Sequence, residues 1–125
     1  MAKILIVEDD ETLARMYQKK LEHEGFLVET AFSGEEGLKA VEKEKPDLIL
    51  LDIMMPGIDG FAVVKQLKAD NETKDIPIII LTNLGTSQIF IDEAKMLGVD
   101  VYLIKYKTSA AEVVAKIKAE LSKRI

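Results

Sequence analysis

Short runs of almost wholly apolar residues recur along the chain and are separated by longer segments of mixed character. Four runs are strong and a fifth, Leu27–Thr30, is weaker; the strong runs are Ile4–Val7, Leu48–Leu51, Ile76–Leu81 and Val101–Ile104. Runs of this length and composition are typical of strands that are buried on both faces of a parallel sheet. The pattern therefore predicts five strands.

The segments that follow these runs have the spacing of amphipathic helices. Their apolar residues recur three or four positions apart, which places them on one helical face: Leu13, Met16, Tyr17 and Leu21; Leu38 and Val41; Phe61, Val64 and Leu67; Ile89, Ile91, Ala94 and Leu97; Val113, Val114, Ile117 and Leu121. Strand and helix alternate five times. Because parallel crossovers are right-handed, this order predicts an α/β fold, a (βα)5 doubly wound sheet with helices on both faces.

Boundary residues support this division. Ser33 and Ser109 each precede a glutamate by three positions, the pattern of a capping box at a helix start. Gly25 and Gly98 stand where helices are expected to end. With 125 residues, 48% of them hydrophobic, the chain is long enough for one folded domain, which we assign to residues 1–125.

Charge and composition exclude several classes of function. A net charge of −5 is the wrong sign for general binding to nucleic acid or anionic membranes. The chain has no cysteine and a single histidine, His23, so thiolate chemistry and histidine-rich metal sites are excluded. The apolar run near the start is too short for a signal sequence or membrane span. We therefore expect a cytoplasmic protein.

Charged and hydroxyl side chains stand where the predicted strands end. They are Glu8-Asp9-Asp10 after the first strand, Asp52 after the third, Thr82 after the fourth and Lys105 after the fifth. In open α/β sheets, ligands bind outside the carboxyl ends of the strands. We therefore expect the functional site at this edge.

A divalent cation and a phosphoryl group suit these residues. If the first and third strands are neighbours, the carboxylates of Asp9, Asp10 and Asp52 repel one another, and a hard cation relieves the repulsion. Oxygen ligands favour Mg²⁺, Mn²⁺ or Ca²⁺, and a site with few direct carboxylates resembles those of Mg²⁺ beside phosphates. Lys105 and Thr82 offer an ammonium and a hydroxyl to phosphoryl oxygens.

Asp52 is the expected nucleophile, because it stands alone at its strand end and aspartyl-phosphate chemistry needs an aspartate beside a divalent ion. The turn at Pro56-Gly57 leaves backbone carbonyls before it available to the metal. Asp9 and Asp10 then hold the cation. The structural alternative is that Asp9-Asp10 only caps a helix that begins near Glu11.

At this point the sequence resembles the receiver domain of two-component response regulators, a family that includes the small single-domain chemotaxis response regulators. The resemblance covers essentially the whole chain. It rests on Ile4-Leu5-Ile6-Val7-Glu8-Asp9-Asp10, on Leu50-Leu51-Asp52-Ile53-Met54-Met55-Pro56-Gly57-Ile58-Asp59-Gly60, on Ile80-Leu81-Thr82 and on Lys105. It implies a flavodoxin-like sheet with strand order 2-1-3-4-5, for which the chemotaxis protein is a known example.

The resemblance also implies roles for single residues. Asp52 would accept a phosphoryl group from a phosphohistidine on a sensor histidine kinase or phosphotransfer protein. Asp9, Asp10, Asp52 and the backbone carbonyl of Met54 would arrange Mg²⁺, with Mn²⁺ as the alternative ion.

A conformational switch is implied as well. Thr82 would move toward the phosphoryl group and Tyr102 would turn inward, which changes the surface of the fourth helix, fifth strand and fifth helix for a downstream protein target or a homodimer. The protein would be a signalling receiver that assists its own phosphoryl transfer and dephosphorylation, and not an enzyme that acts on other substrates.

Two residues depart from the family pattern. The family lysine is usually followed by a proline whose preceding peptide is cis, whereas Tyr106 follows Lys105. A cis bond before a non-proline residue costs about 2.5–4 kcal/mol, so this loop is either trans and differently shaped or strained. Asn83 replaces a usually small residue after Thr82, and either narrows access to Asp52 or forms a hydrogen bond nearby.

Two apolar residues border the expected phosphoryl group. Neither Met54 nor Leu84 has a side chain that could orient a hydrolytic water. Because a positioned base or water-orienting group speeds attack, we expect slow self-dephosphorylation.

Other function classes fit less well. A haloacid-dehalogenase-type phosphatase normally has a second aspartate two residues after the nucleophile, where this chain has Met54. A flavodoxin needs a phosphate-binding loop after the first strand, where this chain has acids. The remaining alternative is a receiver-fold interaction module whose phosphorylation is unused. The sequence leaves open whether the chain acts alone or comes from a longer regulator.

Overall fold

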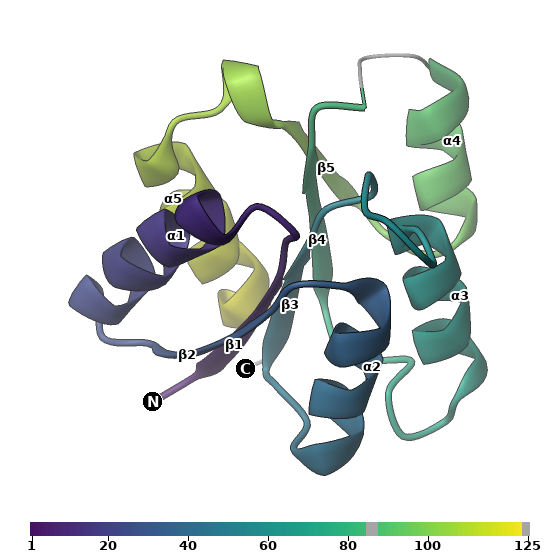
Figure 1. The fold of residues 1–125 in the computed structure, drawn as a ribbon, viewed down its shortest axis with the longest axis horizontal. Coiled ribbons are helices and arrows are strands. Elements are labelled where there is room, and N and C mark those ends of the chain that lie inside the picture. Colours follow the sequence, from purple (N-terminus) through teal and green to yellow (C-terminus); the bar gives the residue numbers. More distant parts are fainter. Residues whose placement is uncertain (85–87, 124–125) are drawn as a thin grey trace.

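Five parallel strands form one sheet in the order β2-β1-β3-β4-β5 (Figure 1). The computed structural model describes residues 1–84 and 88–123. The strands are β1 Lys3–Val7, β2 Leu27–Ala31, β3 Leu48–Leu51, β4 Ile78–Thr82 and β5 Val101–Ile104. The structure confirms the predicted parallel sheet and the strand order that the family resemblance implied.

Helices cover both faces of the sheet (Figure 1). Helices α1 and α5 lie on one face, and helices α2, α3 and α4 lie on the other. Their bounds are α1 Glu11–His23, α2 Gly34–Lys43, α3 Gly60–Ala69, α4 Gln88–Met96 and α5 Ala110–Ser122, and a short 3₁₀ helix, η1 Lys105–Lys107, follows β5. The doubly wound fold is therefore confirmed.

Two hydrophobic cores result from the alternation of side chains along each strand. In β1, Ile4 and Ile6 pack toward α1 and α5, while Leu5 and Val7 pack toward the opposite helices. Because successive side chains of a strand point to opposite faces, a strand with helices on both sides must be apolar at every position. This requirement explains the unbroken apolar runs in the sequence.

The predicted helix boundaries are largely confirmed. Ser109 and Glu112 form a reciprocal capping box at the start of α5. The Ser33 hydroxyl accepts from the Glu36 amide at 3.1 Å, but the Glu36 carboxylate accepts from the Phe32 amide instead of completing the reciprocal bond. Gly25 follows α1 in the left-handed backbone region, with φ of 97°, and there it ends the helix.

Three apolar residues lie elsewhere than the sequence pattern predicts. The fourth strand begins at Ile78 rather than Ile76, because Pro77 has no amide hydrogen to donate to the ladder. Ile76 is still buried, at the edge of the core. Met16 is exposed because the buried side of α1 is formed by Ala14, Tyr17 and Leu21. Ile89 is exposed because the buried residue of α4 is Ala94.

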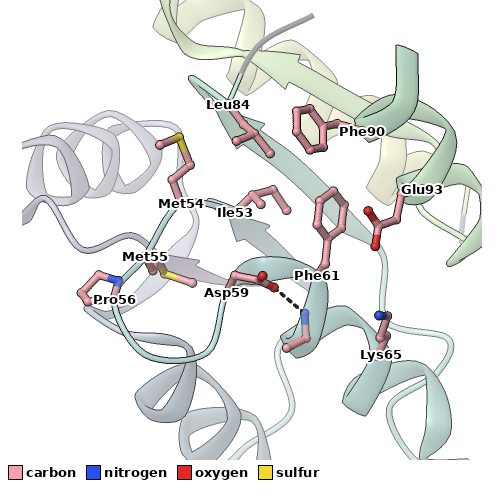
Figure 2. Close-up of a pocket in the computed structure, with 11 residues that line it drawn as sticks. Ile53, Met54, Met55, Pro56, Asp59, Phe61, Lys65, Leu84, Phe90 and Glu93 are labelled. Atoms are coloured by element: carbon pink, nitrogen blue, oxygen red, sulfur yellow. Dashed lines mark hydrogen bonds between the residues drawn. The ribbon is translucent and has the colours of Figure 1, made fainter. Parts of the chain in front are cut away.

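A groove lies beside the carboxyl edge of the sheet, between α3, α4 and the segment that joins β3 to α3 (Figure 2). Its volume is about 710 Å³. The rings of Phe61 and Phe90 stack within it with centroids 6.5 Å apart. Met54 and Leu84, from the segments that follow β3 and β4, also line this groove. The two residues expected to border a phosphoryl group are thus part of one apolar surface.

Gly60 packs against the end of β3 and should tolerate no side chain. A Cβ atom on Gly60 would overlap the Asp52 backbone oxygen and lie 2.7 Å from Ile53 Cα. Because backbone cannot yield as a flexible side chain does, we expect Gly60→Ala to lower the free energy of unfolding by about 3 kcal/mol or more. Urea denaturation measures this loss.

Gly25→Ala provides the control, since a Cβ there meets nothing within 4 Å and only the positive φ is unfavourable. That strain is worth about 1–2 kcal/mol. A Gly60→Ala protein as stable as the Gly25→Ala protein would contradict the close approach of α3 to β3.

Candidate functional site

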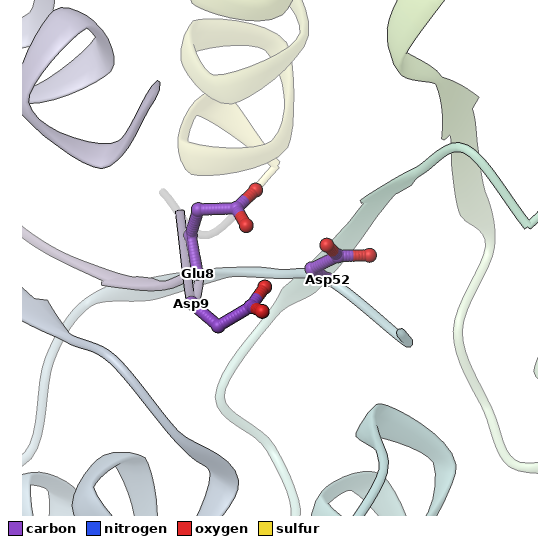
Figure 3. A group of neighbouring side chains, drawn as sticks. All are labelled: Glu8, Asp9 and Asp52. Carbon is purple, nitrogen blue, oxygen red and sulfur yellow. The ribbon is translucent and has the colours of Figure 1, made fainter. Parts of the chain in front are cut away.

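Three carboxylates meet at the carboxyl edge of the sheet (Figure 3). Glu8 and Asp9 extend from the end of β1 and Asp52 from the end of the neighbouring strand β3. One carboxylate oxygen from each residue lies within 4.8 Å of those of the other two. Glu8 and Asp52 are buried, at 4% and 5% exposed, whereas Asp9 is exposed. Asp9 therefore opens the cluster to solvent.

The ammonium of Lys105 lies among the buried members of this cluster. Lys105 Nζ donates to Asp52 Oδ2 at 2.8 Å and forms an ion pair with Glu8. Lys105 stands at the first position after β5, two strands away from β3 in the sheet. The lysine side chain must therefore reach across the end of β4 to pair with both carboxylates.

One ammonium faces two buried carboxylates, and this environment shifts the pKa values of Glu8 and Lys105. Burial raises the pKa of Glu8 to about 7, against the opposing effect of the hydrogen bond from Lys105. For Lys105, burial alone would lower the pKa, but the hydrogen bonds to Asp52 and Glu8 outweigh it and raise the pKa above its ordinary value. Three acidic side chains share the single ammonium of Lys105, so an added cation would be favourable at this cluster.

Backbone amides hold the other functional oxygens. The Met54 amide donates to Asp52 Oδ1 at 3.2 Å, and the Leu84 amide donates to the Thr82 hydroxyl oxygen at 3.2 Å. Thr82 is fully buried at the end of β4. Side chains that accept from an amide two residues onward form tight turns, so each oxygen is oriented by the loop that follows its own strand.

Asp10 has a different position from Asp9. Its Oδ1 accepts from the Leu13 amide at 3.1 Å, which makes Asp10 the N-cap of α1. Asp10 therefore caps α1, and it does not join the group formed by Glu8, Asp9 and Asp52. Its role in metal binding stays a prediction, as does that of the Met54 carbonyl.

Glu8 stood among the acids expected at this edge, but the sequence pattern assigned it no role of its own. It is the first residue after β1, and its Oε2 accepts from the Asp10 amide at 3.1 Å while its carboxylate pairs with Lys105. Two signals in the sequence could have found it. Val7, the last residue of the apolar run, marks the edge of the sheet, and Asp10, directly before the helix, is a capping signal. Glu8 and Asp9 lie between these two residues and are therefore the expected site pair.

The structure after β5 decides between the alternatives that the sequence left open for the Lys105–Tyr106 peptide bond and for Asn83. The peptide bond between Lys105 and Tyr106 is trans, and both residues belong to η1. The side chain of Asn83 forms a hydrogen bond nearby, because its Oδ1 accepts from the Tyr106 amide at 3.2 Å. Tyr102, the expected switch residue, is half-buried on β5, where burial and then the charge of Asp52 raise its pKa.

Comparison with known proteins shows a consistent likeness. The family model described as "Response regulator receiver domain" matches residues 4–118. The chain is 43% identical, over 122 residues, to the alkaline phosphatase synthesis transcriptional regulatory protein PhoP of Bacillus subtilis, a match that covers 95% of this chain and 48% of PhoP. The chain spans about half the length of the curated relatives it matches.

Solved structures share the fold. The receiver domain of the Francisella response regulator 1452 matches with a TM-score of 0.89 and 30% identity over 100% of both chains. The chemotaxis protein CheY4 of Vibrio cholerae matches with a TM-score of 0.88 and 32% identity, over 95% of this chain and 98% of CheY4. Among the helices that the structure describes, none has the length and apolar character needed to cross a membrane.

The raised pKa of Glu8 predicts a pH dependence of stability in the metal-free protein. Because its pKa is about 7 in the folded state and 4.5 ordinarily, the folded state binds this proton more tightly than the unfolded chain. Through this group, wild-type stability falls as pH rises from 4.5 to about 7. Glu8→Gln cannot ionise, so its free energy of unfolding relative to wild type should rise by on the order of 2 kcal/mol over that range.

Urea denaturation in the presence of EDTA measures the difference at each pH. Glu42→Gln, which replaces an exposed carboxylate on α2, is the matched control. A Glu8→Gln difference that stays as flat with pH as the control would contradict a protonated Glu8 in the folded state.

Proposed function

The chain belongs to the receiver domain family of two-component response regulators, and we propose that it is a phosphorylation-dependent signalling switch with Asp52 as phosphoryl acceptor. The observation that carries the proposal is the pairing of Asp52 with Lys105 at 2.8 Å, beside the carboxylates of Glu8 and Asp9. We assign all of residues 1–125 to this one receiver domain.

In the proposed reaction, a carboxylate oxygen of Asp52 attacks the phosphorus of a phosphohistidine. The donor is a sensor histidine kinase or a phosphotransfer protein. The new P–O bond forms as the P–N bond breaks, and the imidazole nitrogen keeps the electron pair and takes up a proton. Thr82 ends the strand next to that of the acceptor, and Lys105 reaches the acceptor from beyond the end of β5; they would supply a hydroxyl and an ammonium to the phosphoryl oxygens.

Carboxylates at this edge fit a bound Mg²⁺ or Mn²⁺, because oxygen-only donor sets with surplus negative charge suit hard cations. Glu8, Asp9 and Asp52 are the ligands that the geometry supports, and Asp10 and the Met54 carbonyl are further ligands that the resemblance implies. When bound, the cation supplies positive charge that screens the acceptor carboxylate from the incoming phosphoryl oxygens.

Phosphorylation would change the pairing of Lys105 and Thr82, and this change is the proposed switch. In the unphosphorylated chain, Lys105 pairs with Asp52 itself and the Thr82 hydroxyl accepts from the Leu84 amide. Added phosphoryl charge favours a conformer in which both contact the phosphoryl oxygens and Tyr102 turns inward. The resulting change of the α4-β5-α5 surface would serve a downstream protein target or a homodimer.

The proposed protein acts in the cytoplasm through contacts with other proteins. Its net charge of −5 disfavours direct binding to nucleic acid or membranes. It is a receiver that assists its own phosphoryl transfer and dephosphorylation, in a family of signalling proteins.

Intact-mass spectrometry after incubation with Mg²⁺ and acetyl phosphate tests the acceptor. We expect one phosphate adduct on the wild type and none on Asp52→Ala, because Asp52 is the carboxylate that both pairs with Lys105 and stands at the end of β3, next to β4 with its terminal Thr82. Asp100→Ala, which removes an exposed aspartate just before β5, is the matched control and should form the adduct at the wild-type rate.

A wild type that binds Mg²⁺ and keeps its fold but forms no adduct would contradict the phosphorylation switch. It would favour the alternative in which the receiver fold serves as an interaction module without phosphorylation.

The apolar border of the site predicts a long-lived phosphoryl group. Met54 and Leu84 line the groove beside Asp52 and offer no side chain to orient a water. We expect Met54→Asn to shorten the lifetime of the adduct by about tenfold, less than the roughly 10²–10⁴-fold effect of a positioned acid or base, because an amide can orient a water but cannot take its proton. The decay of the adduct mass after removal of acetyl phosphate measures this lifetime.

Met96→Asn, which changes a methionine that is 87% exposed on α4, is the matched control and should leave the decay unchanged. Equal decay of the Met54→Asn and wild-type adducts would show that the apolar border does not limit hydrolysis.

A further inference from the structure

A side-chain hydrogen bond joins the residues that directly follow Thr82 and Lys105. Asn83 Oδ1 accepts from the Tyr106 amide at 3.2 Å. Asn83 directly follows Thr82, and Tyr106 directly follows Lys105. The last backbone pair of β4 and β5 is Thr82 with Ile104, so this bond lies just beyond the end of the ladder. The residues that depart from the family pattern are therefore bonded to each other.

The Tyr106 side chain does not anchor this segment in the core. It is 67% exposed, and its ring contacts the Lys107 ammonium, with Nζ 5.9 Å from the ring centroid. Tyr106 instead contributes its backbone amide, which donates to Asn83. Amides in the first turn of a helix lack partners within the helix, and Asn83 satisfies this one at the start of η1.

The position of the Lys105 backbone decides where its ammonium can reach. The side chain extends from the sheet edge, past β4, to Asp52 and Glu8. A flexible lysine side chain loses conformational freedom when it is held in one such arrangement. A backbone that is fixed next to Lys105 reduces the number of arrangements that compete with the productive one.

We propose that Asn83 is a positioning residue for Lys105: by holding the Tyr106 amide, it fixes the loop after β5 so that the ammonium lies at the acceptor Asp52. This inference rests on the proposed function, because it assigns a residue to the phosphoryl transfer at that same site. The bond is possible because the residue after Lys105 is not proline, which has no amide hydrogen to donate.

Asn83→Leu tests the inference, because leucine has similar size and no acceptor. We expect phosphoryl uptake from acetyl phosphate in Mg²⁺ to slow by about fivefold, the factor that corresponds to one ordinary hydrogen bond. The initial rate of adduct formation, followed by intact mass, is the measurement. Asn71→Leu is the matched control, since Asn71 is the other asparagine of the chain and lies exposed between α3 and β4.

A second comparison separates positioning from a general structural role. If Asn83 acts through the ammonium, then Asn83→Leu should have no further effect in a Lys105→Met background, although both single variants are slower than wild type. Equal slowing in the two backgrounds would overturn the inference. Thermal unfolding of each protein shows whether a slower rate arises from loss of the fold, which would also count against the proposed role.

The outcomes distinguish this inference from the proposed function. A wild type without an adduct contradicts the proposed function, and with it any role of Asn83 in the transfer. A wild type and an Asn83→Leu protein that form the adduct at the same rate contradict only the role of Asn83.

Discussion

The pairing of one ammonium with two buried carboxylates is the interaction on which the site depends. Lys105 contacts both Asp52 and Glu8, and Asp9 adds a third carboxylate at the solvent side. Isolated charges are costly to bury, and the ammonium of Lys105 lowers this cost for Asp52 and Glu8. The surplus negative charge in turn makes the edge receptive to a cation. Stability of the edge and its reactivity thus have the same electrostatic origin.

The sheet order makes this pairing possible. Strand β3 lies between β1 and β4, so the end of β3 is flanked by the acids after β1 on one side and by Thr82 on the other. The central strands β1, β3 and β4 place their charged side chains at or beyond their ends, because helices cover both faces of the sheet. The fold therefore gathers at one edge residues that are far apart in the sequence, and the core excludes water from beneath them.

Much of this arrangement follows from the sequence, because it depends on patterns that are local. Apolar runs predicted four of the strands closely, and Asp52, Thr82 and Lys105 were chosen as site candidates because each directly follows such a run. The sequence did not predict that Glu8 would pair with Lys105 while Asp10 caps α1. It depends on where β1 stops and α1 starts, and three consecutive acids give no signal of which one points inward until the backbone geometry is known.

Contacts between distant loops were also beyond the sequence. The choice between the two roles weighed for Asn83 depended on the conformation of the loop after β5, which a trans bond and a 3₁₀ turn determine. Nothing local to Asn83 indicates that its partner is an amide 23 residues further along the chain. Long-range hydrogen bonds of single side chains have no periodicity, and periodicity is what sequence reasoning detects.

One local motif recurs at the site and connects its chemistry to its surroundings. At three strand ends a side-chain oxygen accepts from the amide two residues onward: Glu8 from Asp10, Asp52 from Met54 and Thr82 from Leu84. Negative charge on such an oxygen strengthens its hydrogen bond. A change of that charge therefore alters the bond to the backbone amide of the following loop. Two of the three donors, Met54 and Leu84, line the groove between α3 and α4. Under the proposed phosphorylation of Asp52, the change of charge would act directly on the backbone that shapes this apolar surface, without the need for a longer chain of contacts.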